Sequence, residues 1–188
     1  MGDYEGALAN SKEGIAIQEP LLGKNHPDVA TTYYNIAALL DDMGDYEGAL
    51  AKYKECLAIF ESALGEDHLS AASTHNNIGL VLKNMGDHEG ALSKYKETLA
   101  IQEAVLDKDH PDVACSYNNI GSAVQHMGDY DSALANHKKA LASRLSVLGK
   151  DHHDVASSYN NIGLVLWKMG DFEGALPKYK ECLPFNCQ

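Results

Sequence analysis

The sequence has 188 residues, of which 45% are hydrophobic, and its 15 Lys and Arg residues against 27 Asp and Glu give a formal net charge of −12. This negative charge repels a phosphate backbone, so the composition argues against nucleic-acid binding. No apolar run approaches the roughly 18 residues of a membrane span, and residues 1–4 lack the basic and apolar regions of a signal peptide. We therefore expect a cytoplasmic protein with no membrane partner.

A seven-residue motif recurs along the chain at a constant interval. GDYEGAL at residues 44–50 returns, with small changes, from Gly2, Gly86, Gly128 and Gly170, so the copies are evenly spaced. Periods of about 20 to 50 residues are typical of solenoids, in which each repeat buries its apolar face only against its neighbours. We expect one elongated all-α array over residues 1–188.

Each repeat contains two stretches of helical periodicity. In the first, Tyr33, Ile36 and Leu40 share one face, and a second stripe begins at residue 46. Gly44 is the predicted left-handed residue that ends the first helix, and Asp45 is the predicted N-cap of the second. Because the turn is so short, the two helices must run antiparallel. We name them the A helix and the B helix of the repeat.

Prolines and the ends of the chain modify this scheme. Pro27 and Pro111 suit the first position of an A helix, whereas Pro20 should end the first B helix. Pro177 and Pro184 should distort or shorten the last B helix, at about 3 kcal/mol for a proline in a helix interior. The predicted segments are a partial repeat at 1–22, helix pairs at about 27–64, 69–106, 111–148 and 153–184, and an irregular tail at 185–188.

Residue types that often carry chemistry do not form a site at motif spacing. No nucleophile stands beside a base, so we expect no enzymatic activity and no cofactor. The loop histidines are one repeat apart, too far to share a metal ion, so we interpret them as caps: His26, His68, His110 and His152. The cysteines form no closely spaced even set, so we expect reduced thiols at Cys56, Cys115, Cys182 and Cys187. Glycine near the start of the B helix, at Gly48, Gly90 and Gly174, suggests close approach of another helix.

Six positions of the last complete repeat carry a family pattern: Tyr159, Ile162, Gly163, Leu166, Ala175 and Tyr179. With conservative replacements, they resemble the tetratricopeptide pattern W-x2-L-G-x2-Y…A-x3-F. The 42-residue period and the segment 148–152 resemble the longer repeats of kinesin light chains. The resemblance implies a right-handed α-solenoid of stacked helix pairs, the TPR superhelix, with A helices along its concave side. It also implies a non-enzymatic scaffold that binds a peptide or helix of a partner protein in that concave groove.

Asparagines are the first candidates for the groove. One A-helix position is identical in four repeats, and its preceding neighbour is asparagine in three: Asn35, Asn77, Asn119 and Asn161, with Asn76, Asn118 and Asn160. Asparagine is a mediocre helix former, so its recurrence requires a reason. The amides could form a ladder against the backbone of an extended peptide, or each could bond a neighbouring helix and fix the stacking of repeats.

Variable positions further along the A helix are the second group of candidates. Lys83, Trp167 and Lys168 occupy positions where other repeats carry different polar residues, so they could determine partner selectivity. Trp167 is the single tryptophan and could anchor a partner, or it could contact a further repeat or the last helix.

Two other functions remain open at this point. Cargo selection for a microtubule motor, as in kinesin light chains, would require a coiled coil of three or four heptads, which this sequence does not contain. Self-association is the other alternative, because terminal repeats without polar caps expose core faces that favour end-to-end stacking.

Overall fold

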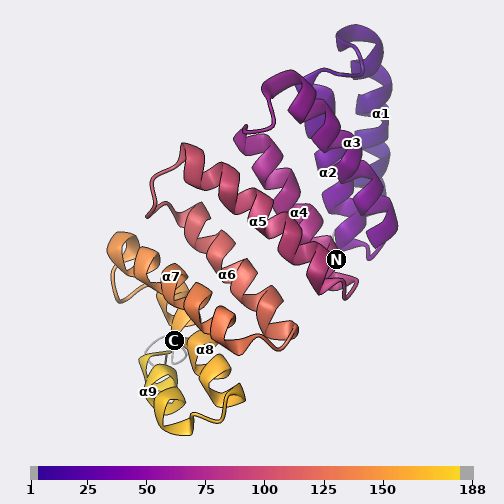
Figure 1. Cartoon of the computed structure of the whole chain (residues 1–188). Coiled ribbons are helices and arrows are strands. Elements are labelled where there is room, and N and C mark those ends of the chain that lie inside the picture. The colour runs from indigo at the N-terminus through magenta and orange to yellow at the C-terminus, as the bar shows by residue number, and fades with distance from the viewer. Residues whose placement is uncertain (1–3, 183–188) are drawn as a thin grey trace. The chain divides into compact units, whose positions relative to one another are not determined.

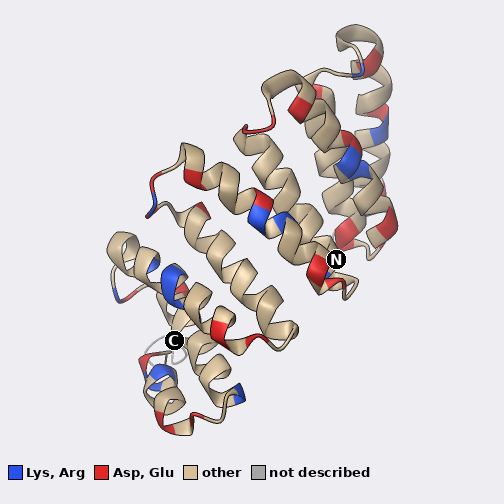
Figure 2. Ribbon diagram, in the orientation of Figure 1, with Lys and Arg blue, Asp and Glu red and all other residues tan. Residues whose placement is uncertain are grey.

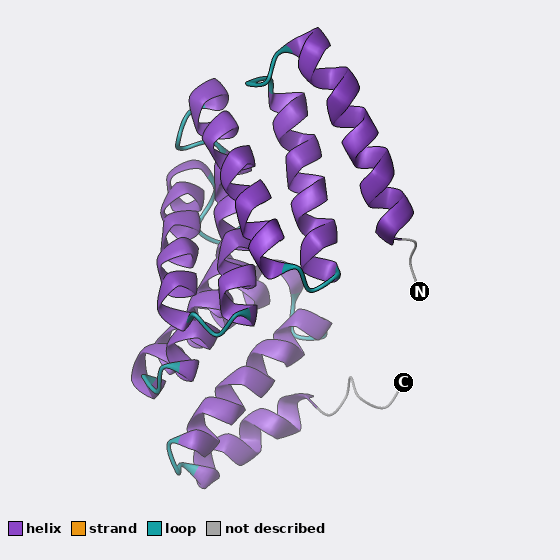
Figure 3. Ribbon diagram, turned by 90° about the vertical axis from the view of Figure 1, so that its right-hand side faces the viewer, coloured by secondary structure: helices purple, strands orange, loops and turns teal. Residues whose placement is uncertain are grey.

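The computed structural model describes residues 4–182, which are helical apart from short turns and contain no strand (Figures 1 and 3). None of the helices in this range is long and apolar enough to cross a lipid bilayer. The helices of the described part are α1 (Tyr4–Leu22), α2 (Pro27–Asp42), α3 (Tyr46–Leu64), α4 (Leu69–Asn84), α5 (His88–Val105), α6 (Pro111–His126), α7 (Tyr130–Leu148), α8 (His153–Lys168) and α9 (Phe172–Cys182). Even-numbered helices are A helices and odd-numbered helices are B helices.

The chain forms two compact units that divide between Ile101 and Gln102, inside α5. In the first unit, α1 packs with α2, α2 with α3 and α3 with α4. In the second unit, α6 packs with α7, α7 with α8 and α8 with α9. Each unit therefore consists of helices that contact their neighbours in sequence, as expected for a repeat architecture. A single array over residues 1–188 stays a prediction.

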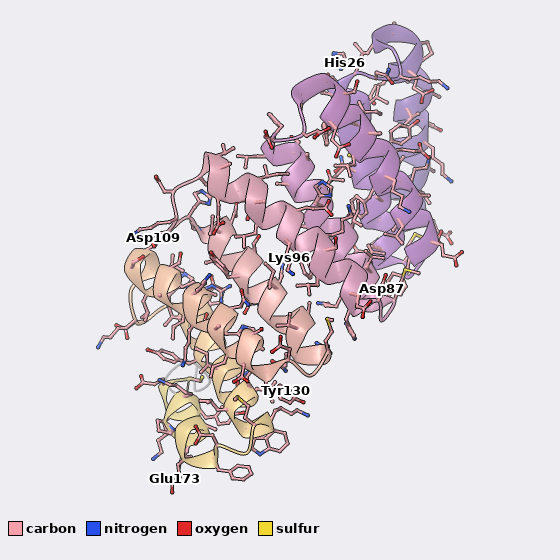
Figure 4. The ribbon with its side chains drawn as sticks, in the orientation of Figure 1. His26, Asp87, Lys96, Asp109, Tyr130 and Glu173 are labelled. Atoms are coloured by element: carbon pink, nitrogen blue, oxygen red, sulfur yellow. The ribbon has the colours of Figure 1, made fainter. Side chains whose placement is uncertain are left out.

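The turn from A helix to B helix has the predicted conformation. Gly44 has a φ of 81°, in the left-handed region where glycine carries no steric penalty. Asp45 Oδ1 accepts a hydrogen bond from the Gly48 N–H at 3.0 Å, which satisfies one of the free donors at the start of α3. Asp87 caps α5 in the same way, since its Oδ1 accepts a hydrogen bond from the Gly90 N–H at 2.9 Å (Figure 4). These local signals are confirmed as helix caps.

The loop histidines cap the A helices. His26 Nδ1 accepts a hydrogen bond from the Asp28 N–H at 3.2 Å, so the imidazole takes the role that serine or aspartate has at most helix starts (Figure 4). The same bond is made in the following repeats by His68, His110 and His152. The interpretation of these residues as caps is confirmed.

The glycines near the start of the B helix have a different role from the one expected. A Cβ atom at Gly48 would lie 2.3 Å from Asp45 Oδ2, so the glycine makes room for the capping carboxylate and not for another helix. Close helix approach occurs instead in the A helix. A Cβ atom at Gly79 would lie 2.6 Å from Cε1 of the buried Tyr95. The expectation for Gly48 was wrong because its nearest large neighbour is the side chain of its own cap.

The core of the first unit lies between α2, α3 and α4. Ala37, Ala49, Tyr53, Ile78 and Val81 form one buried cluster, and Tyr53 is only 2% exposed. Full burial of side chains such as Ile78 and Val81 contributes about 1.5–3 kcal/mol each. The cluster draws on both helices of one repeat and the A helix of the next, so neither helix pair can bury this surface alone.

Two prolines lie inside helices. The prediction that Pro20 ends the first B helix was wrong, because α1 continues to Leu22 and ends at Gly23, which has a φ of 86°. The Gly23 N–H still donates to Glu19 O at 3.0 Å, so Pro20 removes a donor without stopping the last turn. In α9 the chain is helical on both sides of Pro177. Pro184 and the predicted tail at 185–188 lie outside the described residues.

The cysteines of the described part are free thiols, as predicted. Cys56 is fully buried, and its burial raises the pKa of the thiol to about 11. Cys182, at the equivalent position, donates its S–H to Ala156 O at 3.2 Å. Both therefore serve as small packing residues of a B helix. Cys187 lies outside the described residues.

Candidate functional site

Asn77 is bonded to neighbouring helices. Its Nδ2 donates to Tyr34 Oη of α2 at 2.7 Å and to Tyr53 Oη of α3 at 3.2 Å, so both hydrogens of the Asn77 amide are used. Its Oδ1 accepts from Asn76 Nδ2 at 3.3 Å. This arrangement is the one expected if the amide fixes the stacking of repeats. A role for Asn77 in partner binding stays a prediction.

The other predicted asparagines divide by exposure. Asn161 Nδ2 donates to Asn118 Oδ1 at 2.8 Å and joins α8 to α6. Asn119 is half-buried on α6, whereas Asn35 and Asn160 are exposed. The exposed pair is therefore the part of the predicted ladder that solvent, and a partner, can reach directly.

Tyr34 adds an aromatic ring where the next repeats carry asparagine. Its ring meets Tyr53 edge to face, with centroids 5.4 Å apart and an interplanar angle of 75°. Burial raises the pKa of Tyr34, while the bond from Asn77 works in the opposite direction. The ring is therefore held by both neighbours while it lines the pocket described next.

A pocket of about 260 Å³ opens between α2 and α4, with the end of α3 beneath it. Tyr34 and Phe60 supply its aromatic walls. Hydroxyl groups of the two A helices complete the lining, which consists of Thr31, Tyr34, Phe60, Ser70 and Ser73. Such a combination of an apolar interior and a few polar groups is typical of a binding pocket. We name it the Phe60 pocket.

The Phe60 pocket adjoins the predicted asparagines. Thr31 precedes Asn35 by one helical turn, and Ser73 precedes Asn77 by one turn, so each pair shares a face of its A helix. Sequence reasoning missed this pocket. One signal was present, because phenylalanine stands where the equivalent B-helix positions carry Gln18, Gln102 and Arg144.

The equivalent place in the second unit is filled by a cation. Arg144 is 9% exposed, and its Nη1 donates to Ser158 Oγ at 2.8 Å and to Asp154 O at 3.1 Å. Its Nη2 lies 3.9 Å from the sulfur of the exposed Cys115. The guanidinium therefore replaces the apolar interior of the Phe60 pocket with bonded polar groups.

The remaining predicted residues fall in different units. Lys83 is half-buried in the last turn of α4, in the first unit. Trp167 is 49% exposed at the end of α8, in the second unit, and Lys168 Nζ lies 5.3 Å from the centroid of its ring. A half-exposed indole beside a cation is available to a partner as an amphipathic contact.

One group of side chains has the composition of a metal site. His152, His153 and Asp154 bring one ligand atom each within 4.8 Å of one another. His152 Nδ1 is already the acceptor of the Asp154 N–H, and the group sits at the positive end of α8, which disfavours a cation. These residues fit helix capping better than metal coordination.

Antiparallel helix pairs that recur at a constant interval, with caps at both ends and polar and aromatic side chains on the A helices, define a helical-repeat protein. The chain belongs to the tetratricopeptide repeat family, whose model matches residues 1–62, 35–104, 70–146 and 112–188. Repeats of this family generally mediate protein–protein interaction and are typically non-enzymatic. The predicted family is thus confirmed.

Solved structures share the fold of this chain. BtubC (BKLC) from P. vanneervenii is 26% identical in sequence and has a TM-score of 0.89. The alignment covers 97% of this chain and 73% of BtubC. A second structure contains nearly identical TPR-like repeats assigned to a kinesin light chain of Podosopora anserina. Its sequence identity to this chain is 19% and the TM-score is 0.84, and the alignment covers 97% of this chain and 87% of that one. MamA is 17% identical with a TM-score of 0.69, over 97% and 88%. No curated protein sequence matches the chain.

Proposed function

We propose that the chain is a non-enzymatic scaffold that binds an extended peptide or a helix of a partner protein on its A-helix face. The observation that carries the proposal is the Phe60 pocket, which lies between two A helices and combines aromatic walls with hydroxyl groups. An apolar side chain of the partner enters the pocket. Ser70 and Ser73 in the lining, and the exposed Asn35 one helical turn beyond Thr31, then bond the partner's backbone.

The size of the pocket supports a side-chain anchor. About 260 Å³ is below the range of roughly 300–1,000 Å³ that is typical of small-molecule sites. Anchors of protein interfaces are commonly single aromatic or aliphatic side chains in well-packed pockets. The pocket therefore suits one residue of a partner better than a metabolite.

In the second unit we propose a separate contact area around Asn160, Trp167 and Lys168. All three are exposed, and they combine an amide, an indole and a positive charge. Lys83, at the position equivalent to Trp167, offers a positive charge in the first unit. In a chain with a net charge of −12, these lysines favour acidic or neutral residues at the points of contact.

Peptide display against the intact chain tests the proposal. A random peptide library is selected on the folded protein, and the enriched peptides are assayed against Ser73→Trp, which fills the Phe60 pocket from an exposed position. We expect enriched peptides to share an aromatic or aliphatic residue and to bind Ser73→Trp at least about tenfold more weakly, as for the loss of one buried anchor.

The matched control is Ser157→Trp, at the equivalent exposed position of α8. That variant should bind the same peptides normally, because Arg144 occupies the space beside it. Equal affinity of all three proteins for the selected peptides would reject the Phe60 pocket as the anchor.

Self-association is a second candidate, supported by apolar side chains on the two outer helices. On α1, Ile17 and Leu21 are 62% and 76% exposed, whereas Ile59, equivalent to Ile17, is buried. On α9, Phe172 and Leu176 are 64% and 56% exposed. We propose that these faces pair between copies. Light scattering should show a mass that rises with concentration and returns to monomer in Leu176→Lys, while a constant monomer would exclude this function.

A further inference from the structure

The B-helix side carries a recurring contact that the proposed function does not use. Tyr33 projects from α2, and Lys52 of α3 covers its ring, with Nζ 4.7 Å from the centroid. Tyr33 also donates its hydroxyl to Glu19 Oε1 at 2.6 Å. The second unit repeats the tyrosine–lysine pairing at Tyr117 with Lys139 and at Tyr159 with Lys178. In these repeats a lysine of the same chain lies over the tyrosine ring and covers it.

The repeat of α4 and α5 lacks this closure. His75 stands in place of tyrosine. Lys94 pairs with Glu97 Oε2 at 2.7 Å, as its equivalent Lys52 pairs with Glu55 Oε1 at 3.0 Å. His75 is 6% exposed, with Nε2 3.7 Å from Glu61 Oε1. Its Nδ1 lies 3.1 Å from Glu97 Oε2 but makes no hydrogen bond there. The imidazole is smaller than the tyrosine ring of the other repeats, and it leaves this surface open.

The opening is a groove of about 390 Å³ between α3 and α5, with His75 of α4 in its lining. Its lining combines aliphatic and charged side chains: Leu57, Ala100 and Ile101, with Glu61, Glu66, Asp67, Lys94 and Glu97. Four carboxylates face one lysine, which is already paired. Both acidic and basic residues occur along α3 and α5 (Figure 2). We name this opening the His75 groove.

We propose that the His75 groove binds an arginine side chain of a partner protein. The methylene stem lies along Leu57 and Ile101, and the guanidinium reaches Glu61, Glu97 and Nδ1 of His75. Arginine suits this set better than lysine, because its planar fork presents several donors to separate acceptors while its stem packs on apolar surface. The negative charge of the groove repels an acidic segment.

The protonation states agree with this occupant. Burial lowers the pKa of His75, against the influence of Glu97, so the imidazole is neutral near pH 7 and accepts a hydrogen bond. Burial works to raise the pKa of Glu97, but the hydrogen bond and positive charge of Lys94 hold it below its ordinary value. The groove therefore offers an ionised carboxylate beside a neutral acceptor.

The test uses a matched pair of probes on the intact chain. The peptide acetyl-Gly-Ala-Arg-Ala-Gly-amide and its citrulline counterpart, which keeps the shape and lacks the charge, are titrated at low salt and followed by amide chemical shifts. We expect the arginine peptide to shift amides of α3, α4 and α5 around the groove. The citrulline peptide should bind at least about tenfold more weakly, and Glu61→Gln should weaken the arginine peptide about fivefold.

The decisive variant is His75→Tyr, which restores the residue found at the equivalent positions and should fold normally. The larger ring fills the groove, and Lys94 can cover it as Lys52 covers Tyr33, so binding of the arginine peptide should be lost. Equal binding of the arginine and citrulline peptides, or unchanged binding to His75→Tyr, would overturn the proposal. Ser73→Trp, which tests the A-helix face, should leave this titration unchanged, so the two proposals fail independently.

Discussion

Phe60 in the first unit and Arg144 in the second occupy the same position of the repeat, two repeats apart, and create opposite surroundings. Phe60 lines an open pocket with an aromatic interior, whereas Arg144 fills its place with hydrogen bonds to Ser158 and Asp154. The helices around them share bounds, caps and turns. Local sequence signals thus determine where the helices of each unit begin and end. A few side chains between the helices determine whether the space is an apolar pocket or is filled by a cation.

Removing the Phe60 side chain from the wall of its pocket should have the largest effect. Phe60→Ala deletes a side chain that is 6% exposed, and large-to-small changes of this kind cost about 3–5 kcal/mol. We expect the midpoint of urea unfolding to fall accordingly. Amide hydrogen exchange should show the loss first in α2, α3 and α4. An unfolding midpoint within error of wild type would mean that Phe60 is not packed as described.

The two units should also differ in how acid affects their stability, because the second unit contains a buried histidine where the first contains tyrosine. His137, equivalent to Tyr53, is 1% exposed, and neither of its ring nitrogens has a hydrogen-bond partner within the described part of the chain. Burial, helped by the charge of Arg144, lowers its pKa from 6.5 to about 4. Because the folded pKa is depressed, the unfolded state binds the proton first, and stability falls as the pH drops from 6.5 to about 4. The loss reaches about 3 kcal/mol and does not grow below that range.

The control for this prediction is His137→Tyr, the residue present at Tyr53, Tyr95 and Tyr179. Urea unfolding at pH 7.5 and pH 4.5 should show a smaller acid-dependent loss in this variant than in wild type. His75 acts in the same direction in both proteins and cancels in the comparison. The same acid loss in both proteins would contradict the assignment to His137.

Arg144 should be replaceable by its counterpart but not by a small residue. Arg144→Ala removes charge-assisted hydrogen bonds and packing, at about 2 kcal/mol. Arg144→Phe should recover most of that loss, because the ring fills the space and Ser158 Oγ keeps its bond to Asp154 O at 3.0 Å. Thermal unfolding of the two variants tests the order. A phenylalanine variant less stable than the alanine variant would show that the second unit requires the charge itself.

The smallest predicted difference concerns the asparagines. The amide of Asn77 bonds two tyrosines, whereas the amide of its counterpart Asn161 donates to Asn118. Asn77→Ala should therefore cost about 1–2 kcal/mol and Asn161→Ala about 0.5–1 kcal/mol. Urea unfolding measures both, with Asn35→Ala as an exposed control that should change stability by less than about 0.5 kcal/mol. If the three variants were equally stable, the amides would not fix the stacking.

Much of the fold was predictable because its signals are local. Gly44 and Asp45 act within one turn of themselves, and the loop histidine at residue 26 caps the helix that follows it directly. The Phe60 pocket and the His75 groove were not predicted, since each depends on side chains from several segments of the chain. Gly48 was misread for the converse reason: its neighbour was the adjacent cap and not a distant helix.

The contact between Gly79 and Tyr95 has a consequence for how such a chain could be lengthened. Each A-helix glycine must meet a ring that arrives on the next B helix, and the same pairing recurs at Gly121 with His137 and Gly163 with Tyr179. An insertion of one whole repeat keeps every such pair together, whereas a shorter insertion within α4 or α5 separates them. Gene duplication can therefore add whole modules, while small indels are confined to the turns.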